Sequence, residues 1–329
     1  MIKSLQRDLL GIGALVVAVV LLTSNLESGV ALGFVLMVLY AALLSQAWNI
    51  LAGFGGQFSF GHALFFGCGA YAQALAQMSL GLNAWAALLL AVLVAGAVAG
   101  AVGALSFRYG LKGSYFALVT LAFAEVFRIL AVSLDFTGGG VGLMLPLQPG
   151  LMQMQFDSRL GFVLVTLAFL VLAMLVTTWL RHSRFGAQLQ ALRDNEDAAR
   201  AVGVNPFTTK LGAIVLSGAF MGAGGALYLQ VFQYIDPAIA FGPATSVEAL
   251  VGAIVGGLGS LWGPLLGAAV LHALAEATRN LFGQLPGLNM VIYGCVLLLI
   301  VIKAPRGVGP GLASWVSRLL LRRRGENRD

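Results

Sequence analysis

The sequence predicts an all-α integral membrane protein, a polytopic bundle of about ten transmembrane segments, and three features of its composition support this. Hydrophobic residues make up 59% of the 329 residues and charged residues only 10%, whereas a soluble domain carries about 25% charged residues. The apolar residues come in long runs, and about 20 apolar residues are enough to span a bilayer as a helix. Glycine occurs 43 times, and small residues let helices pack closely in lipid.

Ten apolar segments follow one another along the chain. They lie at about residues 9–24, 30–51, 58–78, 84–106, 113–133, 159–180, 210–233, 245–257, 261–278 and 288–303. Lys3 and Arg7 precede the first segment as they would in a signal peptide, but no A-x-A-like cleavage site follows, so we interpret it as the first span. The short eighth segment is expected to form a broken or re-entrant pair with the ninth, which is tolerated where the backbone is buried in protein. Whether these two segments fully span is left open.

The distribution of Lys and Arg predicts that both termini lie in the cytoplasm. With the N-terminus inside, most of the 19 Lys and Arg residues fall in inner connections or in the C-terminal tail, as the positive-inside rule requires. The exceptions are Arg128, within a span, and Arg159 and Arg279, outside. We therefore expect a transmembrane domain over residues 1–305 and a basic cytoplasmic tail over 306–329. A basic tail of this kind fits anionic lipid better than nucleic acid as its partner.

The longest inner connection, residues 181–209, is too charged to span a membrane. It predicts a helix over about 187–203, because Gly203 supplies a typical C-terminal stop. Within it, the spacing Asp197-Ala198-Ala199-x-x-x-Gly203 resembles the EAA motif of ATP-binding-cassette permeases, with Asp in place of Glu. A short cytoplasmic helix with small residues can seat in a groove on a partner. These four residues are therefore expected to couple the chain to an ATPase, and the alternative is an ordinary solvated helix in a loop.

Several further segments resemble the permeases of branched-chain amino-acid transporters of the LivM type. They are GGQFSFGH at 55–62, GSYFALVTLAFAE at 113–125, TGGGVGL at 137–143, the stretch from Arg184-Phe185-Gly186 to Gly203, and GGLGSLWGP at 256–264. Their order along the chain makes the resemblance more specific than any one of them, and it extends over about residues 30–305. Two of these segments, at 55–59 and 256–260, also echo one another, as expected for a transporter built from repeats; the alternative is a chance match in a glycine-rich chain.

The resemblance implies the permease subunit of an ATP-driven importer in a bacterial cytoplasmic (inner) membrane. It would translocate branched-chain or other hydrophobic amino acids delivered by a periplasmic binding protein, and it would work with a second permease subunit and two ATP-binding cassette subunits. The chain has no G-x-x-x-x-G-K-[ST] phosphate loop, so we expect no cofactor on this chain and ATP-Mg on the partner subunits. The exact substrate, and whether the second permease is a related protein or another copy of this chain, stay open. A urea or amide permease is the alternative within the same class.

Polar residues inside apolar segments are the candidates for a translocation pathway. They are Gln57, Ser59, His62, Thr120, Glu125 and Glu248. A carboxylate in lipid is costly and usually faces a partner or a cavity. Glu125 could meet the ammonium of a substrate, or it could form a structural ion pair with Arg128 one turn away, and the spacing favours the ion pair. His62 either lines a cavity or bonds a neighbouring backbone carbonyl, and Thr120 is expected to bond a carbonyl of its own helix.

Two other classes of protein compete with this interpretation. A secondary transporter driven by an ion gradient through Glu125 would need no ATPase, but the predicted coupling helix and the shortage of other carboxylates deep in the membrane speak against it. An intramembrane enzyme is disfavoured because neither Ser59 nor Ser260 lies in a G-x-S-x-G elbow, and the sequence contains no H-E-x-x-H metal motif. We therefore expect neither catalysis nor a metal site in this chain.

Overall fold

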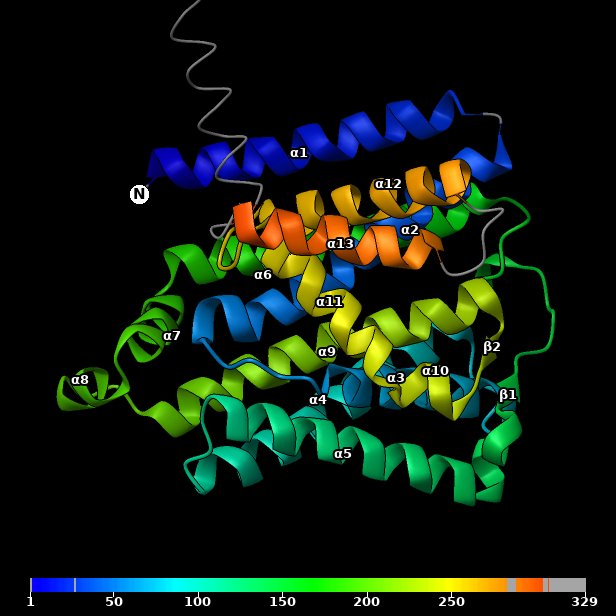
Figure 1. Ribbon diagram of the computed structural model, residues 1–329. Helices are drawn as coiled ribbons and strands as arrows, with labels where there is room; N and C mark the ends of the chain where they lie inside the picture. The colour runs from blue at the N-terminus through cyan, green and yellow to red at the C-terminus, as the bar shows by residue number, and fades with distance from the viewer. Residues whose placement is uncertain (1, 27, 283–287, 304–306, 308–329) are drawn as a thin grey trace, which may run out of the picture.

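The computed structural model describes residues 2–26, 28–282, 288–303 and 307, and it is a bundle of helices (Figure 1). The helices that correspond to the ten predicted segments are α1 (Ile2–Ser24), α2 (Gly29–Asn49), α3 (His62–Met78), α4 (Ala84–Arg108), α5 (Ser114–Ser133), α6 (Arg159–His182), α9 (Pro206–Phe232), α11 (Pro243–Gly256), α12 (Gly263–Phe282) and α13 (Leu288–Lys303). An all-α polytopic membrane protein is therefore confirmed.

Seven stretches of helix in the described part of the chain are long and apolar enough to cross a membrane. One of them, 237–256, combines α11 with the short helix α10 (Pro237–Phe241). The helices α3 and α13 have only 17 and 16 residues. About ten crossings, with both termini inside, thus stay a prediction. The predicted basic tail, 306–329, lies outside the described residues except for Gly307.

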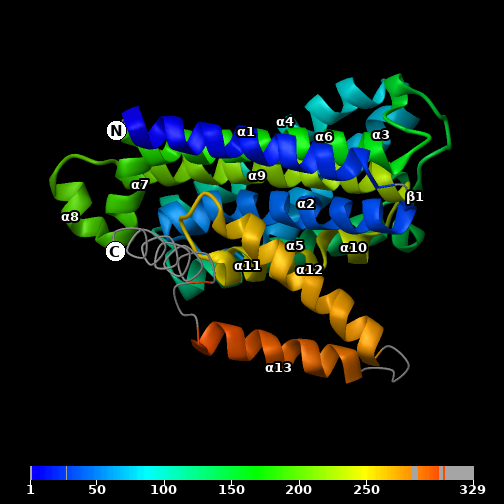
Figure 2. The same ribbon diagram turned by 90° about the horizontal axis from the view of Figure 1, so that it is seen from above.

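The core of the bundle is built around α9, which packs against α3 and α4 (Figures 1 and 2). Its glycines face these neighbours closely: a Cβ at Gly218 or Gly222 would collide with an alanine of α4, and one at Gly225 would collide with the backbone of α3. Small residues permit this approach in a medium that gives no hydrophobic drive for helix association. Figure 1 shows α1 and α5 at opposite edges, with the other long helices between them.

Two interruptions of regular helix lie near one end of the bundle. The helix α2 continues as a π-helix, η1 (Ile50–Phe54), and residues 55–61 then lead into α3. The helices α11 and α12 form a hairpin through residues 257–262, and the close approach of Gly252 to Gly267 lets their backbones touch. They are two separate helices, and a broken or re-entrant pair in the membrane stays a prediction.

The connection 181–209 differs from its prediction in one respect: it contains two helices instead of one. The helix α7 (Arg184–Asp194) ends, and α8 (Glu196–Ala201) begins, around Asn195. Asn195 is extended (φ −158°, ψ 107°), and its side-chain oxygen accepts a hydrogen bond from the backbone N–H of Ala198. Asparagine is a strong N-cap, so it starts a new helix where a continuous one was expected. Gly203, at φ +90°, follows the end of α8.

The end of the bundle that carries α7 and α8 also carries the first turns of α1 (Figure 1). Arg181, near the end of α6, binds Asp8 of α1 there, with 2.8 Å between Nη1 and Oδ2. At the far end, the strand β1 (Leu143–Met144) pairs antiparallel with β2 (Tyr234–Ile235). Between α5 and α6 lie three short 3-10 helices, η2 (Asp135–Thr137), η3 (Gly139–Val141) and η4 (Leu151–Gln153).

Candidate functional site

The helix α8 presents a small exposed surface at its end of the bundle. Asp197, Ala198 and Gly203 are exposed, whereas Ala199 is buried at 3% exposure. Val202, beside Gly203, is 80% exposed, which is unusual for an apolar residue at an end of the molecule rich in charges. Three of the four predicted coupling residues therefore lie on one accessible surface, and the fourth helps to hold α8 in place. We call Asp197, Ala198, Val202 and Gly203 the α8 surface.

Glu196, the first residue of α8, attaches this helix to the rest of the molecule. Its carboxylate lies 2.8 Å from Lys210 Nζ of α9, 3.3 Å from Arg200 and 3.8 Å from Lys112. Partial burial raises the pKa of Glu196, but the three cations lower it more, so its pKa lies below the usual 4.5. The sequence did not reveal this role of Glu196. The motif singled out its neighbour Asp197, and the partner Lys210 lies 14 residues further along the chain.

Arg193, at the end of α7, reaches from the surface to the π-helix at the end of α2. Its Nη1 donates a hydrogen bond to the carbonyl of Gly53 at 2.7 Å. Its alkyl chain packs on Gly56, where a Cβ would lie 2.6 Å from Arg193 Cγ. Glycine is also needed at position 56 for its positive φ of +65°. π-Helices are often found at functional sites, and here one carbonyl of the π-helix receives its hydrogen bond from Arg193 of α7.

The same place joins the two glycine-rich segments that echo one another in the sequence. Asn49 accepts a hydrogen bond from the N–H of Gly259 (2.8 Å) and donates one to the carbonyl of Ser260 (3.0 Å). A Cβ at Gly259 would lie 3.4 Å from Arg193 Nη1. We call the cluster of Asn49, Gly53, Gly56, Arg193 and Gly259 the loop junction. The echo of the two segments was the only signal for it in the sequence, and it did not predict that Arg193 lies against a glycine of each segment.

Four of the predicted pathway residues meet at residues 55–61, and all are buried. The Oγ of Ser59 accepts from the N–H of Gly61 (3.2 Å), and Gln57 Nε2 donates to the carbonyl of Gly55 (3.2 Å). Thr120 Oγ1 donates to the carbonyl of Ala117 (2.9 Å), as expected. The backbone of Thr120 lies so close to Gly61 that a Cβ at that glycine would collide with it.

His62 is held by hydrogen bonds within the core. Its Nε2 lies 2.8 Å from the Oγ of Ser217, which itself donates to the carbonyl of Ala47 at 2.7 Å. Because the hydroxyl proton of Ser217 is used in that second bond, His62 Nε2 must carry the proton in the first one. The partner of Nε2 is thus a serine hydroxyl of α9. This arrangement fixes the ring at the start of α3.

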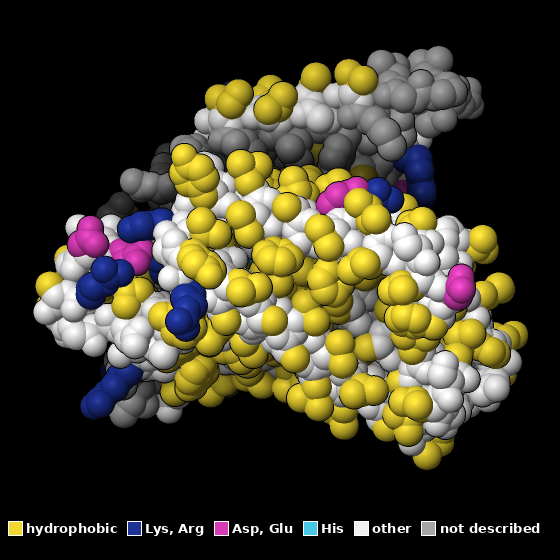
Figure 3. Space-filling model, turned by 90° about the horizontal axis from the view of Figure 1, so that it is seen from below, with side chains coloured by type: hydrophobic (Ala, Val, Ile, Leu, Met, Phe, Trp, Pro, Cys, Tyr) yellow, Lys and Arg dark blue, Asp and Glu magenta, His cyan; other side chains and the backbone are white. Residues whose placement is uncertain are grey.

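Glu125 lies apart from this cluster, on the outer side of α5. Its carboxylate forms a two-pronged ion pair with Arg128, at 2.6 and 2.8 Å. The two side chains are 50% and 34% exposed in the isolated chain. Figure 3 shows apolar side chains over much of the face on which α5 lies, and charged side chains mostly toward the end with α7 and α8. Charged side chains are costly in contact with lipid hydrocarbon, so we expect another protein surface or a polar environment to lie against this ion pair.

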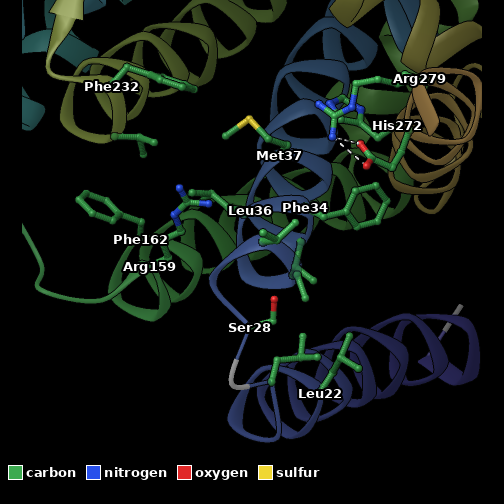
Figure 4. A pocket seen from close by; sticks show the side chains of 18 residues that line it. Leu22, Ser28, Phe34, Leu36, Met37, Arg159, Phe162, Phe232, His272 and Arg279 are labelled. Atoms are coloured by element: carbon green, nitrogen blue, oxygen red, sulfur yellow. Dashed lines mark hydrogen bonds and ion pairs between the residues drawn. The ribbon is translucent and has the colours of Figure 1, made fainter. Parts of the chain in front are cut away.

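Glu248, the last predicted pathway residue, borders a cavity between α2, α11 and α12. The cavity has a volume of about 450 Å³. A second cavity, of about 1030 Å³, lies at the far end of the bundle and is bordered by Arg159, His272 and Arg279 (Figure 4). Among the described residues, no cluster of His, Cys, Asp and Glu could hold a metal ion.

Helical stretches long and apolar enough to cross a membrane, an accessible helical projection at one end and cavities among the helices together fit a membrane transport protein. Comparison with known families makes this specific: residues 30–301 match the family described as "Branched-chain amino acid transport system / permease component". The chain belongs to this family. No solved structure matches it.

Individual relatives agree with this assignment. The chain is 30% identical to the high-affinity branched-chain amino acid transport system permease protein LivM of Salmonella typhimurium, over 83% of this chain and 68% of the relative. It is also 30% identical to LivM of Escherichia coli K12, over 82% of this chain and 67% of that protein. A probable branched-chain amino acid transport permease protein LivH of Methanocaldococcus jannaschii is 29% identical over 46% of this chain and 49% of the relative.

Proposed function

We propose that the chain is one of two permease subunits of an ATP-driven importer in a bacterial inner membrane, and that its substrates are branched-chain or other hydrophobic amino acids. A periplasmic binding protein delivers the substrate at the far end of the bundle, near residues 134–158. Two ATP-binding subunits dock at the end with α7 and α8 and bind the ATP-Mg, so this chain catalyses no reaction. The membership of the family and the names of the relatives support this assignment.

The hydrogen bond from Arg193 to Gly53 supports the proposal that movement of α7 is transmitted to the bundle. An ATPase that pushes on the α8 surface moves α7, and Arg193 is a direct contact between α7 and the π-helix at the end of α2. Asn49 extends this contact to the hairpin of α11 and α12. One displacement at the surface therefore reaches two interrupted segments of the bundle. Interrupted helices are where transporters commonly place substrate and gates.

The predicted pathway residues have different parts in this proposal. Gln57, Ser59, His62 and Thr120 shape residues 55–61, the segment that the loop junction would move, instead of binding substrate. Glu125 serves in the ion pair with Arg128 at a surface covered by the second permease. Glu248 faces a cavity and remains the pathway candidate. A transporter driven by an ion gradient would have no use for the α8 surface, which favours the ATP-driven class.

A pull-down from mild detergent tests the proposed partners, with tagged chains and mass spectrometry of what co-purifies. The wild type is expected to recover ATP-binding subunits and a permease subunit. Ala198→Trp, which places a large ring on the α8 surface, is expected to lose most of the ATP-binding subunits and to keep the permease. Met152→Trp is the matched control, because Met152 is 65% exposed at the far end. Recovery of the wild-type chain alone would contradict the proposal, and so would equal recovery of the ATPases by both variants.

A further inference from the structure

The cavity between α2, α11 and α12 has the size and lining of a site for a small organic molecule. Its volume of about 450 Å³ falls within the range of about 300–1000 Å³ that is typical of ligand pockets. Val247, Val251 and Leu271 form apolar walls, and Ser45, Glu248 and His272 supply its polar groups. It lies beside Ala41 and Ser45 of α2, and α11, which follows the short helix α10, borders it. Transporters place their substrate sites at this depth, beside discontinuous helices.

One polar group of this cavity is buried without a partner. Ser45 is 1% exposed, and its Oγ has no hydrogen-bond partner among the described residues. Burying a hydroxyl group without a hydrogen bond costs free energy. Gly252 of α11 faces this hydroxyl, because a Cβ at that position would collide with Ser45 Oγ. The hydroxyl therefore packs directly against Gly252, and a larger residue at position 252 would displace it.

The charged side chains that line the cavity favour a ligand with a positive charge. Glu248 contributes the carboxylate, with its Oε1 3.9 Å from Nε2 of His272, and no Lys or Arg is among the described residues that line the cavity. A carboxylate in a membrane protein requires a counter-charge. An ammonium group can supply it and can also donate a hydrogen bond to a serine hydroxyl. The apolar walls suit an aliphatic group attached to the same ligand.

The larger cavity gives a route to this one from the far end of the bundle. His272 and Ala275 of α12 border both cavities, and Figure 4 shows His272 beside Arg279, with Arg159 elsewhere on the wall. Arg279 is paired with Glu276 at 2.7 Å. Arg159 donates to the carbonyl of Gly29 at 2.9 Å, and no described carboxylate lies within ion-pair distance of it. A ligand that carries a carboxylate as well as an ammonium would thus meet an arginine first.

We propose that the cavity between α2, α11 and α12 holds the ammonium group and the aliphatic side chain of an amino acid during transport. Glu248 is the counter-ion of the ammonium, the hydroxyl of Ser45 accepts one of its hydrogen bonds, and Val247, Val251 and Leu271 enclose the side chain. The ligand enters through the larger cavity past His272. This inference rests on the proposed function, and it adds the site and the residues with which the chain itself would bind the substrate.

The test uses proteoliposomes with the intact transporter, saturating leucine-loaded binding protein outside and ATP inside. Glu248→Gln keeps the shape of the side chain and removes its charge, so the maximal rate of radiolabelled leucine uptake is expected to fall at least tenfold. Glu248→Asp keeps the charge and should retain more of the rate. ATP hydrolysis stimulated by the binding protein should persist in both variants, since the α8 surface is unchanged. Wild-type uptake by Glu248→Gln would overturn the site.

A second variant tests the apolar wall and does not depend on the charge. Val251→Phe narrows the cavity, so it should lower the rate for leucine more than the rate for valine, and an equal reduction would overturn the placement of the side chain. The two proposals fail differently. Absence of ATP-dependent uptake by the wild type would refute the importer and the site together. Leucine uptake by the wild type that is unaffected by Glu248→Gln would refute the site alone.

Discussion

Glu196 has one carboxylate surrounded by three cations, and its low pKa makes the position of α8 dependent on pH. The pKa of Glu196 in the folded chain lies below the 4.5 of an unperturbed glutamate. A carboxyl group of this kind stabilises the folded state above its unfolded pKa, and this contribution is lost as the pH falls through the folded pKa. The attachment of α8 to Lys210 is therefore complete at neutral pH and weakens in acid.

Glu196→Gln tests this dependence. At neutral pH, hydrogen exchange of residues 196–203 should be faster in the variant than in the wild type, because the charged anchor to α9 is gone. The difference should shrink as the pH falls below about 4.5 and disappear below the folded pKa. Asp197→Asn is the control, since Asp197 is exposed and forms no ion pair within the described residues. A difference between Glu196→Gln and wild type that stays constant in acid would count against the anchor.

The ion pair of Glu125 and Arg128 permits a separate test by double substitution. Glu125→Gln leaves Arg128 as a lone charge on an apolar face, which is costly in a membrane, so this variant should unfold at lower temperature and transport less. Adding Arg128→Gln removes the lone charge, and both quantities should recover toward the wild type. Thermal unfolding in detergent and leucine uptake measure the two effects. If stability recovers in the double variant but uptake stays abolished, Glu125 has a role in the pathway.

At the scale of elements, Arg193 is the contact through which, in the proposed mechanism, a movement of α7 would reach two interrupted segments of the bundle. Arg193→Ala removes its hydrogen bond to Gly53 and leaves the α8 surface intact. ATP hydrolysis should therefore continue, while the amount of substrate transported per ATP falls by at least about fivefold, the lower limit of typical coupling between sites. The control is Arg200→Ala, because Arg200 is 62% exposed and contacts only Glu196 among the described carboxylates. Equal transport per ATP in both variants would exclude the loop junction from the coupling.

The boundaries of the elements show how far local sequence signals reach. Hydrophobic runs predicted the long helices because each must present enough apolar residues to a bilayer. The third segment was expected from residue 58, but α3 begins at His62, since residues 55–61 satisfy their polar groups through side chains such as Ser59 instead of a helical ladder. The signal for the break at Asn195 was equally local, because asparagine is a strong N-cap. One continuous helix was nevertheless predicted through this residue.

For the whole molecule, composition and order of motifs were enough to predict the class, whereas the candidate sites depend on contacts between distant parts of the chain. Arg193 and Gly53 are 140 residues apart, and Asn49 and Ser260 are 211 apart. No periodicity in the sequence encodes such a pairing. The proposed coupling motif was recognisable because its residues lie within seven positions of one another, and the cavity around Glu248 was not, because three helices contribute to it.

The bonds of Asn49 also set an order for the biogenesis of the protein. The ribosome delivers Asn49 to the membrane long before Gly259 and Ser260 exist, and an amide side chain buried without partners is unfavourable in lipid. Until the last third of the chain has been inserted, the end of α2 must therefore stay near the interface or borrow other hydrogen bonds. The bonds that fix the end of α2 can thus form only late in assembly, after the hairpin of α11 and α12 has been made.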